Sequence, residues 1–161
     1  MTEKTPASVW RNPVHFAAFG FGSGAAPVAP GTFGTLAAVP LWLLFMAPLS
    51  TDTYLLTLIV AFVIGVWLCH QTSADIGVHD HGGIVWDEFV GLWIALFAVP
   101  VHWFWILLGF ALFRLFDIWK PWPIGWVDKR VSGGMGIMLD DVIAGIYALV
   151  IIQCLLYFFY Y

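Results

Sequence analysis

The stretch MLDDVIAGIYALVIIQCLLYFFYY occupies residues 138–161 and decides the class of this protein. Its charged residues, Asp140 and Asp141, stand together at its beginning, and the remainder is almost wholly apolar. A bilayer core of about 30 Å takes about 20 apolar residues in a helix. The stretch is therefore predicted to span a membrane, with two carboxylates at its entrance.

The rest of the chain repeats this character. Other apolar stretches that come near the same length, or are somewhat shorter, are Thr53–Ala74, Ile84–Val99, Trp103–Trp119 and Thr35–Pro48. The last of these contains Pro40, so it either spans with a kink or dips into the membrane and returns. None of the stretches alternates between apolar and polar residues as a barrel strand would, so helices are the expected way to satisfy their backbone amides in lipid.

Composition supports the same class. Of the 161 residues, 61% are hydrophobic and 10% are charged, and the mean hydropathy is +0.91. Water-soluble domains of this size do not have so apolar a composition. We expect an all-α fold, a small transmembrane helical bundle of about four to five spans. It is expected to form one membrane-embedded domain over residues 1–161, with residues 1–11 as a disordered cytoplasmic tail.

The charged residues divide the loops into two sets. Five spans place loops 1–34, 75–83 and 120–137 on one side, and every Lys and Arg lies in this set or within two turns of it. By the positive-inside rule this side is cytoplasmic. All the acids except Asp52 lie on the same side of the membrane as the basic residues, so chemistry is expected at the cytoplasmic face.

A weak internal repeat relates two of the acidic sites. Residues 75–96 resemble residues 128–149, and both copies read Gly-Ile-x-x-Asp followed by a second acid. Convergence of two helix starts explains this similarity as well as common origin does. In either case the repeat predicts acid pairs at the cytoplasmic starts of two parallel helices, with Asp87 and Asp140 at similar depths.

Carboxylates are the groups best suited to carry chemistry here. The residues at helical spacing from the acids are Gly and Ala, and such stripes of small residues mark helix contacts in membranes. The acids are therefore expected to face the interior of the bundle. Two carboxylates about 6 Å apart repel by about 3 kcal/mol at an effective dielectric near 20, and a cation relieves this repulsion. Oxygen ligands suit Mg²⁺ or Mn²⁺. The predicted metal ligands are Asp87, Glu88, Asp117, Asp140 and Asp141.

The alternative for these acids is structural. Acids at helix starts are common caps, and an acid within a membrane often pairs with arginine. Asp117 lies at a helix C-terminus, where the helix dipole disfavours its charge. Arg114, one turn earlier, is its local candidate partner.

Three other features of the sequence each have more than one possible role. His79, Asp80 and His81 make a poor zinc set, so the histidines are a proton donor, a phosphate contact or a plain loop. The Gly- and Pro-rich segment 22–35 is either a phosphate cradle at a helix start or a packed turn. Lys120, Lys129 and Arg130 either bind anionic headgroups or only set the topology.

Four motifs carry a resemblance to a known family. They begin at Phe21 (FGSG, then PGT from Pro30), His79 (HDH, then VWDEF from Val85), Arg114 (RLFDIWKPWP) and Gly134 (GMGIMLDD). Over about residues 12–150 the chain resembles the phosphatidylglycerophosphatase A family of bacterial membrane enzymes. The resemblance implies a Mg²⁺-dependent phosphomonoesterase that converts phosphatidylglycerophosphate to phosphatidylglycerol at the cytoplasmic side of the inner membrane.

The resemblance also suggests roles for individual residues. Ser23, Thr32, Lys120 and Arg130 would bind the substrate phosphate, and His79 or His81 would protonate the leaving group, beside catalytic Asp87, Glu88, Asp117 and Asp141. Either water or an aspartate is the nucleophile. The substrate and the bilayer are the expected partners, with no nucleic acid and no obligate protein partner. A small cation carrier or channel subunit is the rival, although transport sites usually lie near the midplane rather than at helix ends.

Overall fold

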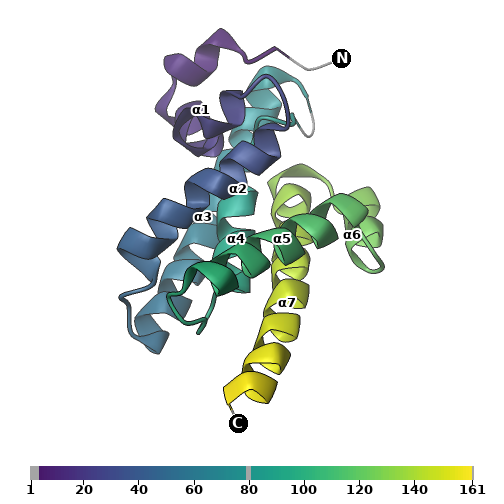
Figure 1. Ribbon diagram of the computed structural model, residues 1–161. Coiled ribbons are helices and arrows are strands. Elements are labelled where there is room, and N and C mark those ends of the chain that lie inside the picture. The colour runs from purple at the N-terminus through teal and green to yellow at the C-terminus, as the bar shows by residue number, and fades with distance from the viewer. Residues whose placement is uncertain (1–3, 79–80, 161) are drawn as a thin grey trace.

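The computed structural model describes residues 4–78 and 81–160, and all regular elements within them are helical. The predicted catalytic residue His79 lies outside the described residues. The α-helices are α1 (Pro13–Ala18), α2 (Pro30–Leu41), α3 (Thr51–Ile76), α4 (Trp86–Ala95), α5 (Trp103–Trp119), α6 (Ile124–Arg130) and α7 (Gly133–Tyr160) (Figure 1). Two 3₁₀ turns, η1 (Ala7–Trp10) and η2 (Gly20–Ala25), and a π-helical turn, η3 (Trp42–Met46), complete the elements. The all-α prediction is confirmed.

Helix α4 lies at the centre of the bundle, packed against α2, α3, α5 and α7. Nearly all its side chains are buried, and Phe89 and Leu92 are completely so. At 1.5 Å per residue its ten residues cover about 15 Å, half the thickness of a bilayer core. The predicted span Ile84–Val99 is therefore wrong as a single crossing helix. The chain turns back after Ala95, where Ala98 takes a left-handed φ of 54° ahead of Pro100.

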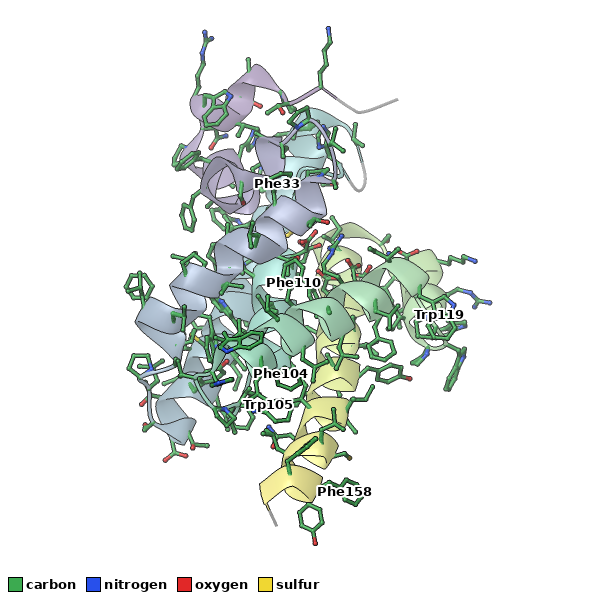
Figure 2. All side chains as sticks on the ribbon, viewed as in Figure 1. Phe33, Phe104, Trp105, Phe110, Trp119 and Phe158 are labelled. Atoms are coloured by element: carbon green, nitrogen blue, oxygen red, sulfur yellow. The ribbon has the colours of Figure 1, made fainter. Side chains whose placement is uncertain are left out.

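Two helices, α3 and α7, are long and apolar enough to cross a membrane. Large apolar side chains are exposed along both, and outward-projecting Trp119 and Phe158 are among the exposed aromatic residues of the bundle (Figure 2). Exposed apolar surface on this scale is typical of a lipid-facing protein. A membrane bundle fits these observations, and the number of four to five spans remains a prediction.

The first apolar stretch stays helical across Pro40. Helix α2 continues past Pro40 into the π-helical turn η3, in which the N–H of Ala47 donates to the carbonyl oxygen of Trp42 (2.8 Å). Proline lacks an N–H and crowds the preceding turn, and a π turn absorbs that disturbance. The segment is therefore a helix over Pro30–Met46 that contains Pro40 and ends in a π-helical turn.

The N-terminal segment caps one end of the bundle, and the C-terminus lies at the opposite end (Figure 1). Val9 is completely buried, and His15 of α1 bonds to Ser8 (3.0 Å) and to Asp75 of α3 (3.0 Å). The prediction of a disordered tail over residues 1–11 is therefore wrong for Ala7–Trp10, which forms an ordered turn.

Small residues set the distance between α4 and α7. A Cβ atom added at Gly145 would overlap the carbonyl oxygen of Gly91, and one added at Gly91 would lie 2.9 Å from the carbonyl oxygen of Asp141. Ala144 and Ala148 are completely buried in the same contact. The predicted small-residue stripe is confirmed as a place where the backbones of α4 and α7 are in close contact.

This contact gives a first testable expectation. Gly145→Ala should lower the free energy of unfolding by about 1–3 kcal/mol, because the added methyl group forces α4 and α7 apart. The matched control is Gly82→Ala, since a Cβ atom there meets nothing within 4 Å. Unfolding midpoints in detergent measure both effects. Equal midpoints for the two variants would show that the close packing of these helices contributes little.

Candidate active site

Three carboxylates from two helices meet at one end of the bundle. Asp117 lies in the last turn of α5, and Asp140 and Asp141 lie on α7. One oxygen from each lies within 4.8 Å of the others. Asp140 and Asp141 are buried and Asp117 is half-buried, so water screens their mutual repulsion poorly.

The acid pair of α7 does not begin its helix. Helix α7 starts at Gly133, so Asp140 and Asp141 lie about two turns inside it, and the first turn contains no acid. The expectation that both acid pairs occupy helix starts is therefore wrong for α7. It holds for α4, where Asp87 and Glu88 lie in the first turn.

Asp141 is nevertheless affected by the charge of every other predicted carboxylate. The charges of Asp117, Asp87, Asp140 and Glu88 all act on the carboxyl group of Asp141. Asp87 and Glu88 are buried like the acids of α7. The convergence that the small-residue stripes predict is thus seen in the structure, with Asp117, Asp140 and Asp141 closest together.

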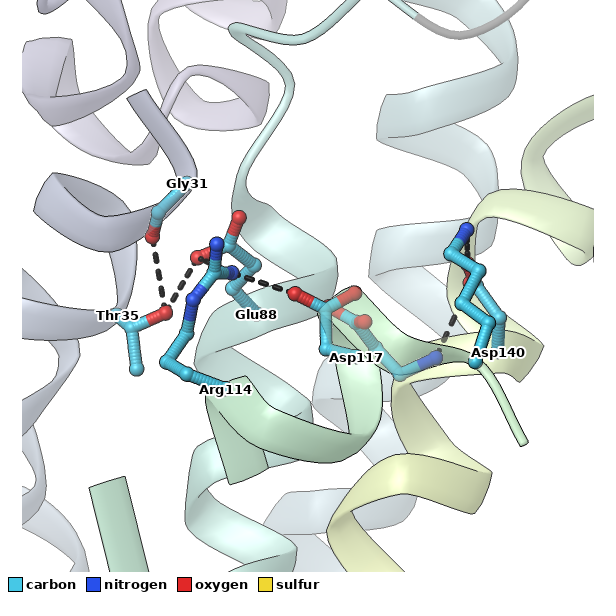
Figure 3. Close-up of polar contacts among 8 residues, drawn as sticks. Gly31, Thr35, Glu88, Arg114, Asp117 and Asp140 are labelled. Atoms are coloured by element: carbon cyan, nitrogen blue, oxygen red, sulfur yellow. Dashed lines mark hydrogen bonds and ion pairs between the residues drawn. The ribbon is translucent and has the colours of Figure 1, made fainter. Parts of the chain in front are cut away.

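Arg114 joins two of the acids. Its Nη1 lies 2.6 Å from Oδ2 of Asp117 and 3.1 Å from Oε2 of Glu88 (Figure 3). The Thr35 hydroxyl also reaches the Glu88 carboxylate, and it lies 2.9 Å from the carbonyl oxygen of Gly31. Arg114 therefore fixes both acids, as the sequence suggested for Asp117.

A glycine makes room for this arrangement. A Cβ atom at Gly31 would overlap the Glu88 carboxylate and would lie 3.0 Å from Nη1 of Arg114. Gly31 belongs to the Gly- and Pro-rich segment 22–35. That segment is thus packed against the carboxylates, which agrees with the packed-turn interpretation of this part of it.

Lys120 joins two acids on the other side of the cluster. This residue ends α5 in a left-handed conformation (φ 46°), and its Nζ lies 2.8 Å from Oδ1 of Asp128 and 2.8 Å from Oδ2 of Asp140. Burial disfavours the lysine charge, but the hydrogen bonds to the two carboxylates outweigh it and raise the pKa of Lys120. Lys120 therefore stays protonated at neutral pH.

Two basic groups serve four carboxyl groups of this region. In the described part of the chain, Arg114 forms ion pairs with Glu88 and Asp117, and Lys120 forms ion pairs with Asp128 and Asp140. Oδ2 of Asp141 is buried and has no hydrogen-bond partner among the described residues. A buried carboxylate oxygen in that position is costly unless a cation binds it. The residues present therefore fit a divalent cation, and the all-oxygen donor set suits Mg²⁺ or Mn²⁺.

Other predicted site residues have different surroundings. The Ser23 hydroxyl donates to the carbonyl oxygen of Gly20 (2.8 Å), and Thr32 is half-buried in the first turn of α2. Arg130 is exposed at the end of α6, with its guanidinium 5.7 Å from the Trp126 ring. No ion pair joins Arg130 to a carboxylate in the described part of the chain.

His81 is buried in the loop before α4. Its Nδ1 accepts a hydrogen bond from the Gly83 N–H (3.0 Å), and its ring packs against Phe19, with centroids 5.3 Å apart. Its role as a proton donor stays a prediction, as do the phosphate contacts assigned to Ser23, Thr32, Lys120 and Arg130.

Sequence reasoning missed two members of the cluster. Thr35 was attributed to the phosphate-cradle segment without a role of its own, and Asp128 was not assigned. The repeat contained a signal for Asp128, because it aligns this residue with Asp75. Each of these acids binds a basic group from another part of the chain: Lys120 for Asp128 and His15 for Asp75.

Comparisons with known proteins identify relatives. The family model described as Phosphatidylglycerophosphatase A matches residues 16–156. A phosphatidylglycerophosphatase A from Escherichia coli (strain K12) is 57% identical over 84% of this chain and 78% of its own length. One from Haemophilus influenzae is 48% identical over 98% of each chain. A relative from Bacteroides thetaiotaomicron, named provisionally as a phosphatidylinositol-3-phosphatase, is 41% identical over 83% of this chain and 87% of its own. No solved structure matches the chain.

Proposed function

The chain belongs to the phosphatidylglycerophosphatase A family and is a phosphatase of phospholipid metabolism, and we propose that it hydrolyses phosphatidylglycerophosphate with Mg²⁺ held by its carboxylate cluster. The proposed metal site rests on one observation: carboxylate oxygens of Asp117, Asp140 and Asp141 lie within 4.8 Å of one another. The rival function, a cation carrier, is not favoured, because the relatives are named as phosphatases.

The proposed metal ligands come from three helices. Asp117, Asp140 and Asp141 would hold the ion, with Asp87 and Glu88 beside them. When bound, Mg²⁺ neutralises phosphoryl oxygens and so favours displacement at phosphorus. Arg114 keeps Asp117 and Glu88 in place, and Lys120 does the same for Asp140.

The remaining residues would act on the substrate. Ser23, Thr32, Lys120 and Arg130 are proposed to bind the phosphate through hydroxyl and cationic groups. An oxygen of water or of an aspartate would form a new bond to phosphorus as the bond between phosphorus and the glycerol oxygen breaks, and the glycerol oxygen would take a proton from His79 or His81. If the nucleophile is an aspartate, water would then hydrolyse the phosphoryl group from it. For Lys120 this role requires that it exchange one of its carboxylate partners for the phosphate.

The site is proposed to face the cytoplasm from the inner membrane. Support comes from the distribution of charge, since the basic residues lie at the end of the bundle that holds the carboxylates. Anionic lipids concentrate at the cytoplasmic surface and would attract Lys129 and Arg130 there.

A phosphate-release assay tests the function. Protein purified in detergent should release phosphate from phosphatidylglycerophosphate when Mg²⁺ is present, and a chelator should stop the release until excess Mg²⁺ is added. Phosphatidylinositol 3-phosphate serves as the comparison substrate, because one relative carries that name. If phosphate release continues in the presence of chelator, the proposed metal dependence is wrong. If phosphate is released from neither lipid, the proposed phosphatase activity is wrong.

A further inference from the structure

Val85 directly precedes α4 and is completely buried. It stands two residues before Asp87 and three before Glu88, the acids in the first turn of that helix. Valine has no polar side-chain group with which to bind an ion or a phosphate. Any part that Val85 plays in the reaction therefore acts through the two acids that follow it.

Three glycines surround the Val85 side chain. A Cβ atom added at Gly20 would lie 2.7 Å from Cγ2 of Val85, and one added at Gly24 would lie 3.1 Å from it. A Cβ atom added at Gly34 would lie 2.5 Å from Cβ of Val85. Because the first two glycines belong to η2 and the third to α2, two separate elements close on one side chain. We call these three glycines the glycine socket.

The backbone of Val85 is also held. Its N–H donates to the carbonyl oxygen of Ala18, the last residue of α1 (2.9 Å). Helix α1 is in turn fixed to α3, because His15 bonds to Asp75 (3.0 Å). The start of α4 is thus attached to the N-terminal segment through main chain and side chain together.

The elements that hold Val85 contain no acid of their own. Neither α1, η2 nor α2 includes an aspartate or a glutamate, so they contribute to the carboxylate cluster only through what they hold. Helix α2 reaches the cluster at the next residue, since Gly34 precedes Thr35, whose hydroxyl contacts the Glu88 carboxylate. The same packing of α2 on α4 therefore serves Val85 and Glu88.

The positions of Asp87 and Glu88 matter because both charges act on Asp141. Charge interactions weaken with distance, and a displacement of about 1 Å in an active site can cost about 100-fold in rate. We propose that Val85 is a positioning residue: the glycine socket holds it, and it places Asp87 and Glu88 at the carboxylate cluster. This inference rests on the proposed phosphatase function.

Substitutions that change the shape of Val85 test this role. Val85→Ala leaves a void beside the socket, so kcat for phosphatidylglycerophosphate should fall at least about tenfold, while KM changes by less than about twofold. Val85→Ile crowds the socket with one more methyl group and should also lower kcat. Val85→Thr keeps the branched shape, so its kcat should stay within about twofold of the wild-type value. The matched control is Val99→Ala, which removes the same groups from a buried valine beyond the other end of α4 and should leave kcat unchanged.

Binding of Mn²⁺ tests the same role independently of turnover. Measured by electron paramagnetic resonance, the affinity for Mn²⁺ should be at least about fivefold lower in Val85→Ala, because displaced acids attract the ion less strongly. It should be unchanged in Val85→Thr and in Val99→Ala. Unfolding midpoints in detergent show which variants are folded, and Val85→Ile replaces Val85→Ala if the latter is not.

Two results would overturn the positioning role. The first is wild-type kcat or wild-type Mn²⁺ affinity in the folded Val85→Ala variant, and the second is an equal loss of kcat in Val99→Ala or Val85→Thr. If the wild type releases no phosphate, the proposed function fails, while the Mn²⁺ affinities of the variants still decide whether Val85 positions the acids. A wild type that binds no Mn²⁺ overturns this role as well.

Discussion

Asp141→Asn should reduce phosphate release at least about 100-fold while leaving the protein folded. Asparagine has the shape of aspartate but lacks its charge, so a metal bound at Asp117, Asp140 and Asp141 loses a ligand that stabilises the transition state. Mg²⁺ should raise the unfolding midpoint of the wild type, since it binds the folded state, and this shift should shrink strongly in the variant. Phosphate assays and thermal unfolding with and without Mg²⁺ measure both effects.

The stability of the metal-free variant separates a functional role from a structural one. Asp141 is 2% exposed, and its Oδ2 has no hydrogen-bond partner among the described residues. Removing an uncompensated buried charge should therefore raise or preserve the midpoint without metal. Asp52→Asn is the matched control, because Asp52 is exposed in the first turn of α3 at the other end of the bundle. Wild-type activity in Asp141→Asn would place the metal elsewhere, and a lower metal-free midpoint would make Asp141 structural.

Apolar stretches predicted helices well where strong breakers border them. Helix α5 matches its predicted bounds, Trp103–Trp119, because Pro100 and Pro121 bracket it. Helix α7 begins at Gly133, within the predicted loop 120–137 and ahead of the predicted span 138–161, although glycine is common both in loops and at close helix contacts. A Cβ atom at Gly134 would overlap the carbonyl oxygen of Val66, so this glycine serves close contact with α3. A glycine's sequence context does not distinguish these two uses.

The length of α4 could not be predicted from hydropathy. A helix surrounded by protein and a helix surrounded by lipid are both apolar on all sides. Only tertiary packing shows that α4 is enclosed by its neighbours and ends after ten residues. The number of spans depends on this distinction, so a list of apolar stretches does not determine it.

The candidate site was predictable as chemistry but not as contacts. Helical spacing placed the acids on inward faces, because one helix face is a local property of the sequence. The contact between Thr35 and Glu88 depends on how α2 packs on α4, which local spacing does not specify. The family resemblance suggests Lys120 as a phosphate ligand, and the structure shows its two carboxylate partners, Asp128 and Asp140, which the sequence did not suggest.

Arg114→Gln should cause the largest loss of stability among single substitutions at the site. Arg114 is 14% exposed and bridges Glu88 and Asp117, which are themselves 10% and 16% exposed. Removing one partner of a buried ion pair leaves uncompensated charge, at a cost of about 3–5 kcal/mol. The stability of Arg114→Lys should lie between that of Arg114→Gln and that of the wild type. Lysine keeps the charge, but its single ammonium group lacks the planar fork that serves two carboxylates. Denaturant titration in detergent gives the unfolding free energies.

A second substitution identifies the cause of that loss. In Glu88→Gln/Arg114→Gln, one unpaired carboxylate becomes neutral, so part of the lost stability should return, although activity should remain low because Asp117 is still unsupported. Arg11→Gln is the matched control, since Arg11 is exposed, and surface substitutions of this kind change stability by less than about 0.5 kcal/mol. If Arg114→Gln unfolds as readily as Arg11→Gln does, the bridge does not hold the site together. If the double variant is no more stable than Arg114→Gln, the loss arises from packing rather than from the stranded charge of Glu88.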